Sequence, residues 1–119
     1  FLSQEELLDQ NGNIRSITVT ELGFSSYSGE KLQAAAVAYC YYIIEANPYV
    51  EAFIMNRQTD ALEELRNGLA FGIYETDQSA KFLYEVFKDL GTEQDKENLD
   101  FMLNILGAET LEETLSWAQ

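Results

Sequence analysis

The order of hydrophobic and polar positions predicts a strand followed by a long helix in the first half of the chain. In residues 14–22 side chains alternate between two faces, and Ile17 and Glu21 share one of them. Residues 23–29 are rich in serine and glycine and predict a loop. Apolar side chains then recur at helical spacing over residues 30–46, on so many sides that more than one neighbour is expected to cover the helix.

A second strand is predicted at residues 49–58, where apolar side chains run without interruption from Ala52 to Met55. Such runs are typical of parallel strands, which are usually buried on both faces. The predicted helix at 30–46 provides a crossover long enough for the two strands to pair in parallel with a right-handed connection. Residues 69–74 predict a third, shorter strand.

The rest of the chain is expected to be mostly helical. Apolar side chains at helical spacing predict helices over residues 79–90 and 95–106, each followed by a glycine that can end it. Thr110 and Glu113 have the spacing of a capping box, which predicts one more helix at the end of the chain. A short helix is also predicted before the first strand, at residues 3–9.

Composition restricts the classes of partner that remain. The chain has 119 residues and a net charge of −14, from 21 acidic and 7 basic side chains. Nucleic acids and anionic lipid surfaces are bound mainly through lysine and arginine, so we expect no nucleic-acid partner. No apolar run reaches the length of about 18 residues that a membrane-spanning helix needs, so no membrane insertion is expected. A neutral ligand such as a sugar is indifferent to this charge.

The available side chains also restrict the chemistry. The chain has no histidine and one cysteine, Cys40, which argues against a zinc site and an internal disulfide. The glycines at 23 and 29 do not form a phosphate-binding loop, because Glu30 comes before Lys31 and no hydroxyl residue follows. The residues therefore predict neither a zinc site nor a phosphate-binding loop.

Glu21 is the main candidate for chemistry because it comes at the end of the first predicted strand. Folds with parallel strands bind ligands at the carboxyl ends of those strands. A carboxylate there can act as nucleophile or as acid/base in glycoside hydrolysis. A simpler interpretation of the residue pattern alone is structural, with Glu21 accepting hydrogen bonds or pairing with Arg57.

The stretch "ITVTELGF", which contains Glu21, resembles the seventh strand of clan A glycoside hydrolases, where an I-T-E-x-G/D pattern carries the nucleophilic glutamate. Those enzymes are (β/α)8 barrels. The longer string "TELGFSS…GE…QAAAVAYCYY…EANPYVEAFIMNRQTD…GLAFGIY" is similar to an uncharacterised bacterial family thought to adopt a glycosidase-like barrel. Members of that family are mostly large, secreted or surface proteins. This similarity covers about residues 14–106, judged by the order of predicted strands and helices.

The resemblance implies an α/β fold in which the chain forms strands seven and eight, the last two β/α units of a (β/α)8 barrel. Residues 1–13 would form a helix and turn before strand seven. Residues 14–91 would hold the two barrel strands with their helices, and residues 92–119 would be appended helices. The other strands would come from the remainder of a longer protein, and a secreted or cell-surface location follows from the same resemblance.

The resemblance also implies a site. Glu21 would be the nucleophile of a retaining glycosidase that acts on a poly- or oligosaccharide. The acid/base of the clan lies at the end of the fourth strand, outside this chain, so the isolated chain is expected to be inactive. The candidate substrate-binding residues that follow the two strands are Tyr27, Asn56, Arg57 and Asp60. Each has a structural alternative, such as a turn at Asp60 or a surface ion pair at Arg57.

Two other functions stay open. The barrel could bind carbohydrate without catalysis, in which case the whole protein would not supply a second carboxylate opposite Glu21. Alternatively, the chain could be a free-standing acidic domain that binds a protein partner through its helical C-terminal half. A folded, monomeric protein of this length in nature would favour the latter.

Overall fold

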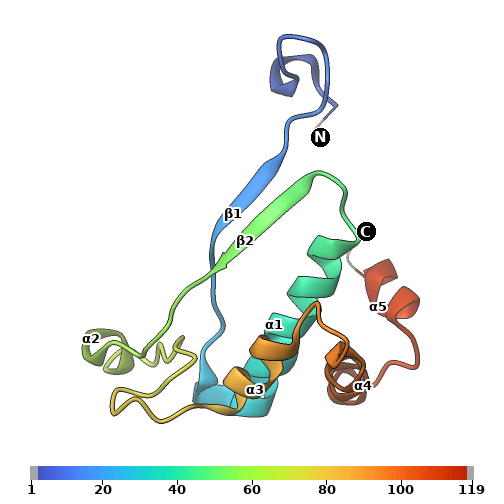
Figure 1. Cartoon of the computed structure of the whole chain (residues 1–119). Coiled ribbons are helices and arrows are strands. Elements are labelled where there is room, and N and C mark those ends of the chain that lie inside the picture. Colours follow the sequence, from blue (N-terminus) through green and yellow to red (C-terminus); the bar gives the residue numbers. More distant parts are fainter. Residues whose placement is uncertain (1–2, 118–119) are drawn as a thin grey trace.

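The structure is a computed structural model that describes residues 3–117 (Figure 1). In this range the chain is a small α/β domain with an open sheet of two parallel strands and five α-helices. The elements are β1 (Ile17–Leu22), α1 (Glu30–Glu45), β2 (Val50–Met55), α2 (Leu62–Leu65), α3 (Phe82–Asp89), α4 (Asp95–Leu106) and α5 (Leu111–Trp117). Two short 3-10 turns, η1 (Glu5–Leu7) and η2 (Ser26–Ser28), precede β1 and α1.

The two strands pair in parallel, with α1 as the crossover between them, which confirms the predicted pairing. Ile17 lies opposite Val50, and Val19 lies opposite Phe53. Figure 1 shows the strand pair extending away from the cluster of helices. Within residues 3–117 each strand has one edge without a strand partner, so the sheet is open and not closed.

β1 contains an irregularity next to Glu21. Val19 lies opposite Phe53 and Leu22 lies opposite Met55, so three steps along β1 match two steps along β2. The extra residue is a bulge, a feature that re-aims side chains and is frequent at the rims of barrels and beside active sites. Glu21 is exposed whereas Val19 and Leu22 are half-buried, so the strict alternation predicted for this strand is wrong at its carboxyl end.

Only one face of β2 is covered. Phe53 contacts Tyr41 of α1, with ring centroids 6.4 Å apart. Ile54 points the other way and is 55% exposed. The prediction that β2 is buried on both faces is therefore wrong for residues 3–117, since α1 covers one face and no described element covers the other.

The core lies between α1, α3 and α4. Its fully buried side chains include Ala34, Ala38, Leu83 and Met102. The alanines leave room for the neighbouring helices to approach α1 closely, which explains the many apolar positions on that helix. At the edge of this core the Tyr42 hydroxyl donates to the Asp95 carboxylate at 2.7 Å. The pKa of Tyr42 is raised, mainly because the hydroxyl is buried and secondly because it donates this hydrogen bond to Asp95.

The C-terminal helices agree closely with the sequence pattern. α4 has the predicted bounds, and α5 begins after Thr110. One of the two capping-box hydrogen bonds is present, since Glu113 N donates to Thr110 Oγ1 at 3.2 Å. Glu113 Oε2 accepts from Glu109 N at 2.9 Å, one residue before the expected donor. No helix in the described part of the chain is long and apolar enough to cross a membrane.

Three short elements differ from their prediction. Residues 69–74 do not form a strand; Tyr74 makes isolated bridges to Thr59 and Ala80 instead. The bridge to Ala80 holds the chain extended there, so α3 begins at Phe82 and not at residue 79. The helix expected at 3–9 is reduced to the single turn of η1.

Candidate functional site at the carboxyl edge of the sheet

Glu21 is the penultimate residue of β1 and lies at the carboxyl edge of the two parallel strands. Its side chain is exposed to solvent and is not covered by the helices. Within residues 3–117 the carboxylate has no hydrogen-bond or ion-pair partner. The acid is therefore free to meet a ligand or a group from another part of the protein.

The ends of β1 and β2 are hydrogen-bonded to each other directly after Glu21. Asn56 N donates to Leu22 O at 2.7 Å, which continues the ladder beyond β2. A Cβ atom on Gly23 would lie 2.3 Å from Asn56 O. This distance is far below contact, so only glycine lets the two backbones approach here. Asn56 is thus fixed beside the residue that follows Glu21.

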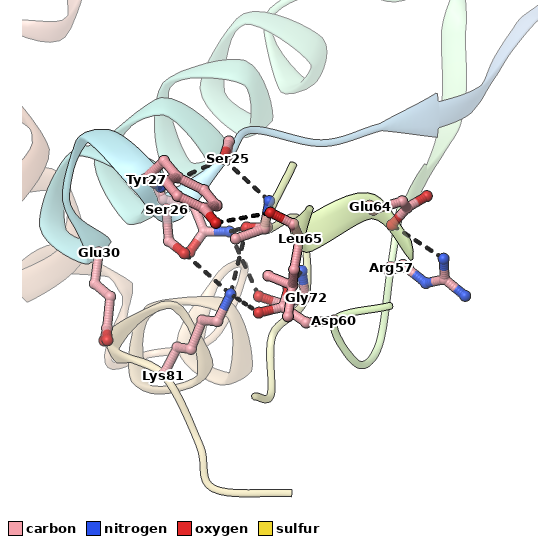
Figure 2. A network of polar contacts seen from close by, with 12 residues as sticks. Ser25, Ser26, Tyr27, Glu30, Arg57, Asp60, Glu64, Leu65, Gly72 and Lys81 are labelled. Carbon is pink, nitrogen blue, oxygen red and sulfur yellow. Dashed lines mark hydrogen bonds and ion pairs between the residues drawn. The ribbon is translucent and has the colours of Figure 1, made fainter. Parts of the chain in front are cut away.

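Arg57 points towards α2. Its Nη1 lies 3.1 Å from Glu64 Oε2, and both side chains are partly exposed (Figure 2). The ion pair between Arg57 and Glu21 that the sequence allowed is therefore not formed. A partly exposed pair of this kind contributes little to stability.

Tyr27 lies in η2, in the loop that follows β1. Its hydroxyl donates to Leu65 O of α2 at 2.7 Å (Figure 2). The residue is nevertheless 63% exposed. Tyr27 thus joins the loop after β1 to the helix after β2 and still presents an aromatic surface to solvent.

Asp60 forms a buried ion pair that no pattern in the sequence singles out. Its Oδ2 lies 2.6 Å from Lys81 Nζ, and both side chains are completely buried (Figure 2). The other oxygen, Oδ1, accepts from Gly72 N at 2.6 Å. A buried charge is tolerated when it is paired in this way and its remaining oxygen is hydrogen-bonded. Asp60 has a structural role here, and a contact between Asp60 and a substrate stays a prediction.

Lys81 and Gln33 extend this network to the neighbouring loops. Lys81 Nζ donates to Ser26 Oγ at 3.1 Å and to Ala70 O at 3.3 Å. Gln33, buried on α1, donates through Nε2 to Phe24 O at 2.8 Å and to Ala70 O at 3.1 Å. The loops after both strands are therefore held by one set of buried polar contacts.

Residues 1–114 match a family whose description is "Family of unknown function (DUF5722)". The chain belongs to this family. Neither a curated protein nor a solved structure matches it. Membership in DUF5722 confirms the similarity to an uncharacterised family, whereas a relationship to glycoside hydrolases stays an inference from the short strand motif.

In this DUF5722 chain a further acidic residue, Glu75, lies close to the buried network of Asp60 and Lys81. Partial burial raises the pKa of Glu75; the charge of Lys81 opposes this shift, and the nearby Asp60 carboxylate adds to it. Among the described residues no group of three or more His, Cys, Asp and Glu side chains could hold a metal ion.

The structure brings together only some of the predicted site residues. Asn56 lies beside the end of β1, where its N–H donates to the carbonyl of Leu22, the residue after Glu21. Tyr27 and Arg57 both contact the region of α2. Asp60 is withdrawn into the buried network beneath them. Lys81, Gln33 and Gly72 are structurally important residues of this region that the sequence patterns missed.

Proposed function

We propose that the chain supplies strands seven and eight of a glycoside-hydrolase-like (β/α)8 barrel, and that Glu21 is the nucleophile of a retaining glycosidase. The observation that carries this proposal is the place of Glu21. It is an exposed carboxylate at the carboxyl end of a strand whose parallel neighbour follows through a helical crossover. In barrels of this kind the catalytic residues come from the carboxyl ends of the strands.

The open sheet supports the barrel. In a (β/α)8 barrel the helices cover the outer face of the sheet, and side chains of further strands fill the inner face. Here α1 contacts Phe53 on one face, while Ile54 and Thr20 are exposed. If the chain is part of a barrel, the remaining strands would cover this face in the whole protein. An apolar side chain such as Ile54 would then be exposed only in the chain described here.

The proposed reaction has two steps. A carboxylate oxygen of Glu21 attacks the anomeric carbon, the glycosidic C–O bond breaks, and the leaving oxygen takes a proton from a carboxylic acid elsewhere in the barrel. That group, now a carboxylate, removes a proton from water, and the water oxygen displaces Glu21 from the sugar. The two carboxyl groups need to lie about 5–5.5 Å apart in a retaining enzyme. The chemistry requires a poly- or oligosaccharide partner and no metal or organic cofactor.

One feature of the site favours the alternative of a barrel that binds carbohydrate without catalysis. A nucleophilic carboxylate is usually kept ionised by nearby hydrogen-bond donors or cations. In the described part of the chain Arg57 is engaged with Glu64, and Glu21 has no such partner. Under our proposal the partner comes from another strand of the barrel.

Trapping of the covalent intermediate tests the proposal. The full-length protein is incubated with a panel of 2-deoxy-2-fluoro glycosides that carry a good leaving group, and its peptides are analysed by mass spectrometry. We expect the peptide that contains Glu21 to gain the mass of the fluorosugar. Glu21→Gln should abolish this label, whereas Glu51→Gln, on the exposed part of β2, should leave it unchanged.

Three results would contradict the proposal. The first is a label on another carboxylate, and the second is a label that persists in Glu21→Gln. The third is carbohydrate binding by the full-length protein without any label or hydrolysis, which would establish the non-catalytic alternative.

A further inference from the structure

We infer that Asp60 and Lys81 are positioning residues, which clamp the loops after β1 and β2 and thereby fix the strand end that carries Glu21. The inference deepens the proposed function, on which it rests for what is being positioned. The clamp itself is defined by the buried ion pair between Asp60 Oδ2 and Lys81 Nζ, which are 2.6 Å apart.

The clamp contacts every segment that leaves the carboxyl edge of the sheet. Lys81, just before α3, donates to Ser26 in the loop after β1. Asp60 itself lies in the segment after β2, and its Oδ1 binds Gly72 N. Lys81 also donates to Ala70 O at 3.3 Å. Three segments far apart in sequence are thus tied to one pair of buried charges.

Hydrogen bonds and the peptide links between neighbouring residues together connect the clamp to the end of β1. Gly72 N binds Asp60, and the next residue, Ile73, donates from N to Arg57 O at 3.1 Å. Arg57 follows Asn56, whose N–H donates to Leu22 O at 2.7 Å. Leu22 is the neighbour of Glu21. A shift of Gly72 would therefore be transmitted to Glu21 through ordered backbone contacts.

The contacts of Asp60 and Lys81 indicate that the pair orients the loops through hydrogen bonds and does more than fill space in the core. A Cβ on Gly72 would lie 2.4 Å from Asp60 N and 2.8 Å from Asp60 Oδ1, so this glycine lets the backbone reach the carboxylate. Apolar residues in place of a buried ion pair often stabilise a protein equally well. They lack the directed hydrogen bonds that hold three loops in one arrangement, and this directionality is what we assign to Asp60 and Lys81.

Amide hydrogen exchange of the full-length protein tests the clamp. Three variants are compared with the wild type: Lys81→Met, the double variant Asp60→Leu/Lys81→Met, which removes both the ion pair and the hydrogen bond to Gly72 N, and the control Asn98→Ala. The control removes a buried hydrogen bond between Asn98 Nδ2 and Val86 O, which joins α4 to α3 away from the sheet. Because the double variant has no unpaired buried charge, it separates loss of the clamp from loss of global stability.

We expect exchange in residues 22–27, 56–60 and 68–74 to accelerate by about 10-fold or more in both clamp variants, as local openings of these loops become easier. Amide exchange within α4 should change less in the double variant than in Asn98→Ala. In Asn98→Ala the three loop segments should exchange at the wild-type rate. Wild-type exchange of the loops in the double variant would overturn the inference. So would equal acceleration throughout the chain.

A chemical readout separates positioning from stability. At saturating fluoroglycoside, the rate constant for labelling Glu21 should fall by about 10-fold or more in the double variant and stay unchanged in Asn98→Ala, since misplacement of a reacting group affects the chemical step. An unchanged labelling rate in the double variant would contradict the positioning role. If the wild type is not labelled at all, the proposed function fails, while the exchange measurement still decides whether the clamp orders the loops.

Discussion

Replacement of Glu21 by alanine should lower glycoside hydrolysis by the full-length protein by about 10⁴-fold or more, the scale observed when an essential nucleophile is removed. The reason is that no other described carboxylate lies at this position on the strand edge. Azide can occupy the space that the side chain leaves and attack the anomeric carbon in its place. Addition of azide should therefore restore turnover and yield a glycosyl azide with inverted anomeric configuration, measured by nuclear magnetic resonance.

Glu51→Ala is the matched control for this experiment. Glu51 is also an exposed glutamate on the sheet, but it lies near the amino end of β2 and accepts a hydrogen bond from Thr18 at 3.0 Å. Its replacement should change hydrolysis by less than about threefold, because the residue lies away from the carboxyl edge. Glu21→Ala with activity close to wild type would contradict the assignment of the nucleophile.

Lys81→Met should destabilise the protein by about 3–5 kcal/mol, because loss of one partner leaves the buried Asp60 carboxylate without compensation. The measurement is the midpoint and slope of urea unfolding. Adding Asp60→Asn to this variant should recover part of the loss. The asparagine has no charge, and its Oδ1 can still accept from Gly72 N.

Lys88→Met is the matched control for the stability measurement. Lys88 pairs with Glu85 on the surface of α3, where both side chains are exposed to solvent. Loss of an exposed pair costs about 1 kcal/mol or less. Equal effects of Lys81→Met and Lys88→Met would show that the Asp60 carboxylate is not buried as the structure has it.

The elements that the sequence predicted well are those that local pattern determines. Two strand-like segments joined by a helical crossover are expected to pair in parallel. β1, α1 and β2 have this arrangement. The bounds of α4 follow from regular apolar spacing and from Gly107, which has the left-handed conformation that ends a helix. The capping box before α5 is likewise a local signal.

The features that the sequence missed depend on distant contacts. Asp60 and Lys81 are separated by twenty residues that include only the short helix α2, so their spacing has no period that could reveal a pair. Gln33 stands among alanines on a buried helix, and a polar residue at such a position was the one available hint of an internal network. The bulge in β1 has no residue signature, and it displaced Glu21 from the face that simple alternation predicts.

The exposure of β2 is the feature that connects the fold to the proposed function. Ile54 and the outer edges of both strands are open in the described chain, whereas its sequence has the continuous apolar run of a strand covered on both faces. Under our proposal further strands of a barrel cover the open side, which would explain this difference. The two strands would then be part of a larger parallel sheet with Glu21 at its rim.

Hydrogen exchange of Val50–Met55, compared between the isolated chain and the full-length protein, tests this claim most directly. If further strands pair with and cover β2, its amides should exchange about 100-fold or more slowly in the full-length protein, because edge amides become paired and buried. Equal exchange rates in the two forms would mean that the open sheet is complete as it stands, and the barrel and its catalytic rim would have to be abandoned.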